Sequence, residues 1–149
     1  MSFFDWTPDL DLGIKVIDEQ HRRIADYIND LHQAIEVNDK QEILAVADRV
    51  VNYTYEHFAY EETLLKKANY LLVEPHIQVH RRFKESAEKM KADIINSSDL
   101  GPARKMRSDL MLWLTNHIKK EDADYTESVG HILRKKSFLG GVFNFFNKK

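Results

Sequence analysis

Seven residues of metal-binding type recur at helical spacing along this chain. They are five histidines and two carboxylates: His21, His57, Glu61, His76, His80, His117 and Asp122. His57 lies four residues before Glu61, and His76 lies four residues before His80. In a helix the two members of each pair therefore project from one face. Imidazole nitrogen and carboxylate oxygen together suit iron or a similar first-row metal. The chemistry that these side chains indicate is therefore metal coordination.

The number of these side chains indicates how many ions they hold. Zinc takes four ligands in structural sites and about three protein ligands in catalytic sites, whereas calcium and magnesium prefer oxygen ligands. Two octahedral ions offer about twelve positions. Five imidazoles and two bridging carboxylates would fill about nine, and one oxygen atom bridging both ions about two more. We therefore expect two ions and one open coordination position.

One familiar di-iron pattern is absent from the chain. Ferritin-like di-iron proteins carry Glu-x-x-His on two helices, with further Glu ligands. No histidine of this sequence has a Glu three residues before it. The sequence therefore does not predict an oxidase-type centre.

Apolar residues at helical intervals predict the elements that position these side chains. The first helix begins near Ile17, with Asp18 as its N-cap. The second follows Asp39, which stands three residues before Glu42 as in a capping box, and it should end near Ala68.

Two more helices follow in the second half. Pro75 suits the first turn of the third helix, Ser97 lies where that helix is interrupted, and Gly101 with Pro102 opens the fourth. No segment alternates as a strand does, and the connections are short. We expect an all-α fold: an up-down-up-down antiparallel four-helix bundle with an extra C-terminal segment.

We expect one domain over residues 1–149. Its N-terminal arm would cover 1–16, its bundle about 17–120 and its C-terminal extension about 126–149. The chain shows no internal repeat and no linker that would divide it.

Each predicted helix carries at least one histidine on its apolar face. A single buried histidine is usually satisfied within the core. Five imidazoles without a cation would compete for partners, and each unsatisfied group costs about 1–3 kcal/mol. Asp122, five residues after His117, would need a slight turn of the chain to reach the same place. His32 and His131 lie outside the pattern and are assigned no metal role.

Composition argues against other classes of protein. With 43% hydrophobic and 31% charged residues, the chain has the balance of a water-soluble globular protein. A net charge of -2 argues against nucleic acid as a partner. The absence of cysteine excludes disulfides and thiolate ligands. The N-terminus does not read as a secretory signal, so we expect a cytoplasmic protein.

Four segments together resemble the hemerythrin family, and in particular its bacterial members. The matching segments are Ile17–His21, His57–Glu62, His76–His80 and Trp113–Ile118 with Asp122 after it. The resemblance spans Trp6 to about Tyr125, and the long segment after it has no counterpart in the pattern.

The resemblance implies a particular assignment of ligands to two non-haem iron ions. His76, His80 and His117 would bind one iron, and His21 with His57 would bind the other. Glu61, Asp122 and an oxo or hydroxo group would bridge the pair. Because the next residue in a helix is rotated by about 100°, we expect Glu62 to be solvated rather than bound.

The resemblance also implies reversible binding of dioxygen at the iron with two histidines. Ile24, Phe58 and Leu114 are candidates for the wall of the oxygen pocket, although plain core packing explains each of them equally well. Excluding water there would suppress loss of the bound oxygen.

Several functions remain open from the sequence alone. Oxygen storage, delivery and sensing share one binding step. A di-iron oxidase or peroxidase is the enzyme alternative, but it needs a substrate pocket and a spare acid or base, and we find neither in the pattern. A third alternative is an oxygen-linked signalling or docking module. The sequence does not determine the oligomeric state.

The C-terminal tail has an apolar pattern of its own. Basic residues flank the aromatic and aliphatic residues Phe138, Val142, Phe145 and Phe146. Such a segment suits contact with a membrane surface or a partner protein. Packing back on the chain's own bundle is the alternative that we favour slightly, since Gly140-Gly141 weakens a helix.

Overall fold

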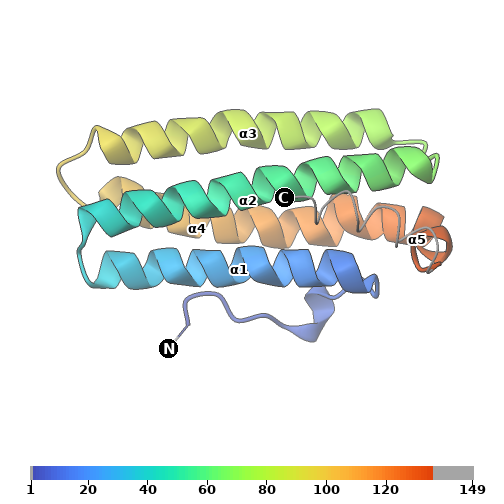
Figure 1. Ribbon diagram of the computed structural model, residues 1–149, viewed down its shortest axis with the longest axis horizontal. Helices are drawn as coiled ribbons and strands as arrows, with labels where there is room; N and C mark the ends of the chain where they lie inside the picture. Colours follow the sequence, from blue (N-terminus) through green and yellow to red (C-terminus); the bar gives the residue numbers. More distant parts are fainter. Residues whose placement is uncertain (1, 136–149) are drawn as a thin grey trace.

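The four long helices α1 to α4 lie side by side along the long axis of the molecule (Figure 1). The computed structural model describes residues 2–135. Its elements in chain order are a 3-10 helix Pro8–Leu10, α1 Lys15–Glu36, α2 Lys40–Lys67, α3 Val73–Ile95, α4 Gly101–His117, a π-helix Ile118–Asp122 and α5 Ala123–Leu133. Each long helix contacts the next one, and α4 also contacts α1. The predicted all-α, up-down-up-down four-helix bundle is confirmed.

The start of α1 differs from the prediction. Ile14, not Asp18, is the N-cap, and the helix begins at Lys15. Asp18 lies in the first turn, where its carboxylate accepts hydrogen bonds from the backbone N–H groups of Leu12 and Gly13 at 2.8 and 3.0 Å. Asp18 therefore stabilises the chain that leads into the helix, and a negative charge in the first turn also suits the helix dipole.

The other predicted helix boundaries are confirmed. Asp39 caps α2 by accepting the backbone N–H of Glu42 at 3.2 Å. The helix ends with Ala68 as its C-cap. Asn38 and Asn69, which follow the ends of α1 and α2, have φ angles of 57° and 56°. Asparagine tolerates this left-handed conformation better than most residues, so it reverses the chain over a short connection.

The chain beyond the predicted bundle forms a further helix. Residues 126–133, expected to belong to an extension without a counterpart in the pattern, make up most of α5. Tyr125, Val129 and Leu133 are buried against Ile14 and Tyr60. Three apolar residues spaced by four therefore attach α5 to the end of the bundle. The predicted tail contacts of Phe138, Val142, Phe145 and Phe146 lie outside the described residues.

Two apolar clusters make up the core, and the polar candidates lie along the helices near the points where one cluster gives way to the other. On α1, His21 falls between Ile17 of one cluster and Ile24 of the other. On α2, Phe58 belongs to the large cluster and Leu64 to the small one. The bundle therefore holds its metal-type residues between two apolar sections.

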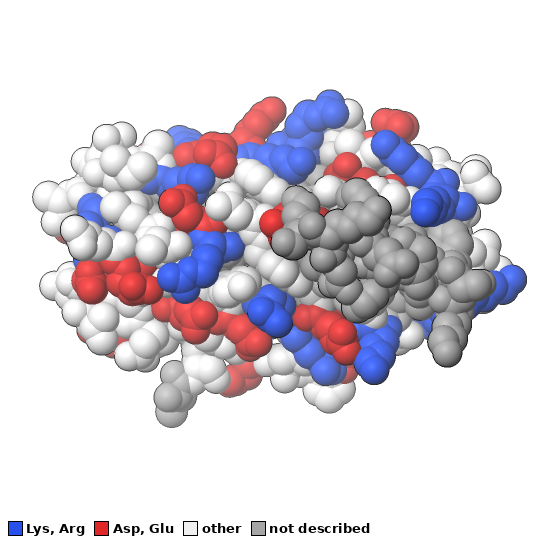
Figure 2. Space-filling view, viewed as in Figure 1, with Lys and Arg blue, Asp and Glu red and all other residues white. Residues whose placement is uncertain are grey.

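One face of the molecule can be seen in Figure 2, and it carries charges of both signs. Acidic and basic side chains are interspersed on the face shown in Figure 2. Within the described residues, every helix is too short or too polar to cross a lipid bilayer.

Candidate metal centre

The seven metal-type side chains meet in one buried cluster. Each is at most 3% exposed. They form two groups, Glu61, His76, His80 and His117 in one and His21, His57, Glu61 and Asp122 in the other. Within each group the ligand atoms lie within 4.8 Å of one another, and Glu61 belongs to both. One group holds three histidines and the other holds two.

A π-helix brings Asp122 into the cluster. In an α-helix, a residue five positions after His117 would point about 140° away from it. The chain instead forms a π-helix over Ile118–Asp122, and its wider turn reduces that offset. As a result Oδ1 of Asp122 lies 3.2 Å from Nε2 of His117. The slight turn of the chain expected to bring Asp122 to the cluster is provided by this π-helix.

The two carboxylates each reach both groups of histidines. Oε1 of Glu61 lies 2.8 Å from Nε2 of His76 and 3.1 Å from Nε2 of His80. Its other oxygen lies 3.6 Å from Nε2 of His57. Asp122 is placed likewise, with Oδ1 3.2 Å from His76 and Oδ2 3.2 Å from His21. Such carboxylates are placed to bridge two ions.

Several nitrogen and oxygen atoms of the cluster are buried without a hydrogen bond. They are both ring nitrogens of His21, Nε2 of His57, Nδ1 of His117 and both oxygens of Asp122. Some of these atoms approach a neighbour to 3.2 Å, but not in hydrogen-bonding geometry. Buried polar groups are normally paired, and atoms that converge on one another without hydrogen bonds fit a shared cation. The donor set of imidazoles and carboxylates suits first-row metals.

The charges in the cluster are strongly coupled. Burial lowers the pKa of His57 to about 3. Burial also acts to lower the pKa of His76, but the hydrogen bond to Glu61 and the negative charges of Glu61 and Asp122 outweigh it and raise that pKa to about 10. Burial and the nearby Asp122 act to raise the pKa of Glu61, yet the surrounding histidines hold it well below its usual range. The surroundings thus favour the anionic form of Glu61 and the protonated form of His76, but the neutral form of His57.

Three residues that the sequence patterns missed hold the cluster from outside. Nδ1 of His57 lies 2.6 Å from Oε1 of Gln20, and the hydroxyl of Tyr125 donates to Oε2 of Glu61 at 2.9 Å. The prediction that Glu62 is solvated is wrong. Its side chain is 19% exposed, and a carboxylate oxygen lies 2.8 Å from Nδ1 of His80. Partners of this kind orient metal ligands.

Sequence position offers a weak signal for these outer partners. Gln20 and Glu62 are direct neighbours of cluster residues, and Tyr125 follows Asp122 by three. The rotation of about 100° does turn Glu62 off the face of Glu61. However, α3 packs against that side of α2, and it supplies His80.

The three candidate pocket residues are all buried in the large apolar cluster. Ile24, Phe58 and Leu114 are between 1% and 3% exposed. Phe58 stacks on the ring of His80, with centroids 3.8 Å apart and planes 6° apart, whereas its centroid is 6.1 Å from that of His57. It therefore lies closer to the group of three histidines. Their part in an oxygen pocket stays a prediction.

The two remaining histidines lie outside both groups. Nδ1 of His32 is 2.9 Å from a guanidinium nitrogen of Arg107 and its ring stacks on Phe3. His131 is exposed on α5.

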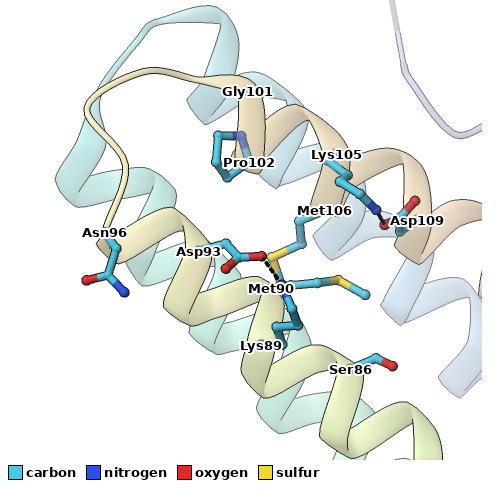
Figure 3. Close-up of a pocket in the computed structure, with 10 residues that line it drawn as sticks. All are labelled: Ser86, Lys89, Met90, Asp93, Asn96, Gly101, Pro102, Lys105, Met106 and Asp109. Carbon is cyan, nitrogen blue, oxygen red and sulfur yellow. Dashed lines mark hydrogen bonds and ion pairs between the residues drawn. The ribbon is translucent and has the colours of Figure 1, made fainter.

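A groove between α3 and α4 is separate from the cluster. It has a volume of about 560 Å³ (Figure 3) and is lined by Ser86, Lys89, Met90, Asp93, Asn96, Gly101, Pro102, Lys105, Met106 and Asp109. None of the seven cluster residues lines it. A second pocket, of about 340 Å³, reaches His76 and is also lined by Tyr70 and Lys120.

Comparison with known proteins gives a consistent set of relatives. Residues 12–127 match the family model of the hemerythrin HHE cation binding domain. The chain is 37% identical over 131 residues to a bacteriohemerythrin of Pseudomonas aeruginosa, a match covering 88% of this chain and 84% of the relative. It is 25% identical over 122 residues to a myohemerythrin of Theromyzon tessulatum, covering 82% and 90%.

A solved structure of a leucine-to-alanine variant of hemerythrin has the same fold. It aligns with a TM-score of 0.74 at 25% identity, covering 87% of this chain and 98% of that one.

Proposed function

The chain belongs to the hemerythrin family, and we propose that it binds dioxygen reversibly at a non-haem di-iron centre made by the buried cluster. The observation that carries this proposal is the shared carboxylate. Glu61 belongs to both groups of ligand atoms, and Asp122 directs one oxygen toward each of them. An arrangement of this kind suits two ions held side by side and not one.

The assignment of ligands follows from the two groups. His76, His80 and His117 would hold one iron, His21 and His57 would hold the other, and Glu61 with Asp122 would bridge them. An oxo or hydroxo group would complete the bridge. When bound, the two irons supply the electrons that dioxygen takes up reversibly. The protein contributes the geometry, the two negative charges that partly neutralise the irons, and exclusion of water by burial.

Apolar side chains next to the ligands would line the oxygen pocket. Leu114 precedes His117 by three residues on α4, and Ile24 follows His21 by three on α1. Both side chains are 3% exposed. Within this proposal they keep water and protons away from the open position, and Phe58 packs against the opposite group.

Storage, delivery and sensing all use this binding step, and dioxygen is the ligand in each. The oxidase or peroxidase alternative would need a substrate pocket at the centre. The groove of Figure 3 is lined by the C-terminal half of α3 and the N-terminal half of α4. None of the cluster residues lines it. The second pocket, of about 340 Å³, does reach His76, so measuring turnover of an added substrate is what separates oxygen binding from an oxidase.

Metal analysis combined with absorption spectroscopy tests the proposal. We expect two irons per chain, and a new absorption band when air is admitted to the reduced protein that disappears when oxygen is removed. His57→Ala should abolish the band, whereas the matched change His32→Ala, outside the cluster, should leave it. One metal per chain, zinc in place of iron, or rapid multi-turnover oxidation of an added substrate would each contradict the proposal.

A further inference from the structure

The two groups of histidines are held by outer partners of different charge. His80, in the group of three, has its Nδ1 2.8 Å from a carboxylate oxygen of Glu62. His57, in the group of two, has its Nδ1 2.6 Å from the amide oxygen of Gln20. In both rings Nε2 faces the cluster, so Nδ1 carries the proton and donates a hydrogen bond to the outer oxygen.

Other charges near the cluster add to this asymmetry. Oε2 of Glu121 lies 3.6 Å from Nδ1 of His117, which is also in the group of three. On the other side, Nδ1 of His21 is buried without a partner. Glu62 is only 19% exposed and Gln20 only 4%. Because charges shielded from water are screened weakly, the negative charge beside His80 acts mainly on the group of three histidines.

We propose that Glu62 determines which iron loses its electron first, by favouring the ferric state at the iron bound by His76, His80 and His117. This inference rests on the proposed di-iron function. A carboxylate that accepts a hydrogen bond from Nδ1–H makes the imidazole a stronger electron donor to the metal, and its charge stabilises the more positive ion. The neutral amide of Gln20 also accepts a hydrogen bond from His57, but it carries no charge, so it strengthens the imidazole less and does not stabilise the more positive ion. After loss of one electron, the iron with two histidines and the open position therefore stays ferrous.

The step itself involves electrons alone. One electron passes from the ferrous pair to an outer-sphere oxidant such as ferricyanide, which is reduced by one electron. No bond to the protein forms or breaks. Glu62 is in this scheme a positioning residue, since it acts through His80 and not on the oxygen molecule.

Exchanging the two outer partners tests the inference at constant charge. Glu62→Gln keeps a hydrogen-bond acceptor for His80 but removes the charge, Gln20→Glu adds a charge beside His57, and the double variant does both. Glu127→Gln, which removes an exposed carboxylate from α5, is the control for net charge. The first one-electron midpoint potential is measured in each protein, and ⁵⁷Fe Mössbauer spectra of the half-oxidised form show whether the remaining ferrous ion is five- or six-coordinate.

We expect Glu62→Gln to make the first oxidation about tenfold less favourable, an upward shift of about 59 mV for one electron. The control should not shift. In the double variant the ferric ion should move to the group of two histidines, leaving a six-coordinate ferrous ion. If Glu62→Gln loses iron, Gln20→Glu still tests the inference, because its added charge should move the ferric ion by itself.

Unchanged potentials and an unchanged ferric position in both single variants would overturn the inference, even if the protein binds dioxygen. Failure of the unmodified protein to form an oxygen adduct would instead contradict the proposed function. The two failures are therefore distinguishable.

Discussion

Replacing Tyr125 by phenylalanine should weaken metal binding more than it disturbs the bundle. The hydroxyl of Tyr125 donates to Oε2 of Glu61 at 2.9 Å, and both side chains are fully buried. Burial and the charge of Glu61 raise the pKa of Tyr125 well above its usual value, so the hydroxyl remains a donor across the working pH range. A hydrogen bond to a charged group contributes about 1.5–3 kcal/mol.

This magnitude predicts two measurable effects. Loss of an outer partner of a metal ligand typically lowers affinity by about 10–100-fold, which competition with an iron chelator would measure. The metal-free protein should also melt several degrees lower, since 1 kcal/mol corresponds to roughly 2–4 °C for a chain of this size.

Tyr70→Phe is the matched control. The hydroxyl of Tyr70 donates to Asp124, which belongs to neither group of cluster residues. This change should lower the melting temperature with much less effect on chelator competition. Equal iron affinity in Tyr125→Phe and in the unmodified protein would refute the idea that Tyr125 orients Glu61.

Three further predictions follow from the buried cluster. Leu114→Ala should cost about 2–5 kcal/mol of stability and shorten the life of the oxygenated state far more than it lowers iron content. If the oxygenated absorption band decays at the same rate in the variant and in the unmodified protein, Leu114 does not line the pocket. Asp122→Ala should bring iron below two per chain, because the histidines of both groups lose a nearby carboxylate oxygen, whereas Glu127→Ala should not. Elemental analysis that finds two irons per chain in both variants would contradict a bridging role. The metal-free protein should be most stable near pH 6.5 in urea titrations. The depressed pKa of His57 makes stability fall as pH drops from about 6.5 toward 3, and the raised pKa of His76 makes it fall as pH rises from about 6.5 through 10; a stability that rises steadily up to pH 9 would show that His76 does not hold its proton.

The helices and the cluster residues could be predicted because both depend on local periodicity. A residue four positions on lies on the same helical face, so His57 with Glu61 and His76 with His80 could be assigned to one face without a structure. The N-cap at Asp39 could be predicted for the same reason, since its partner is three residues away. Asp18 shows the limit of local patterns. It fits the N-cap preference, but the chain before it offers two backbone donors, and the helix starts earlier.

The sequence by itself determined the helical periodicity and the identity of the seven polar residues that share the apolar faces, because each depends on neighbours within one or two turns. Only the tertiary structure decided which groups surround them. Gln20 meets His57 across 37 residues, Glu62 meets His80 across 18 and Tyr125 meets Glu61 across 64. These contacts depend on how α1, α2, α3 and α5 pack, and the position of Asp122 depends on a π-helix. Packing between helices sums many weak contacts from distant parts of the chain, and no local pattern records that sum.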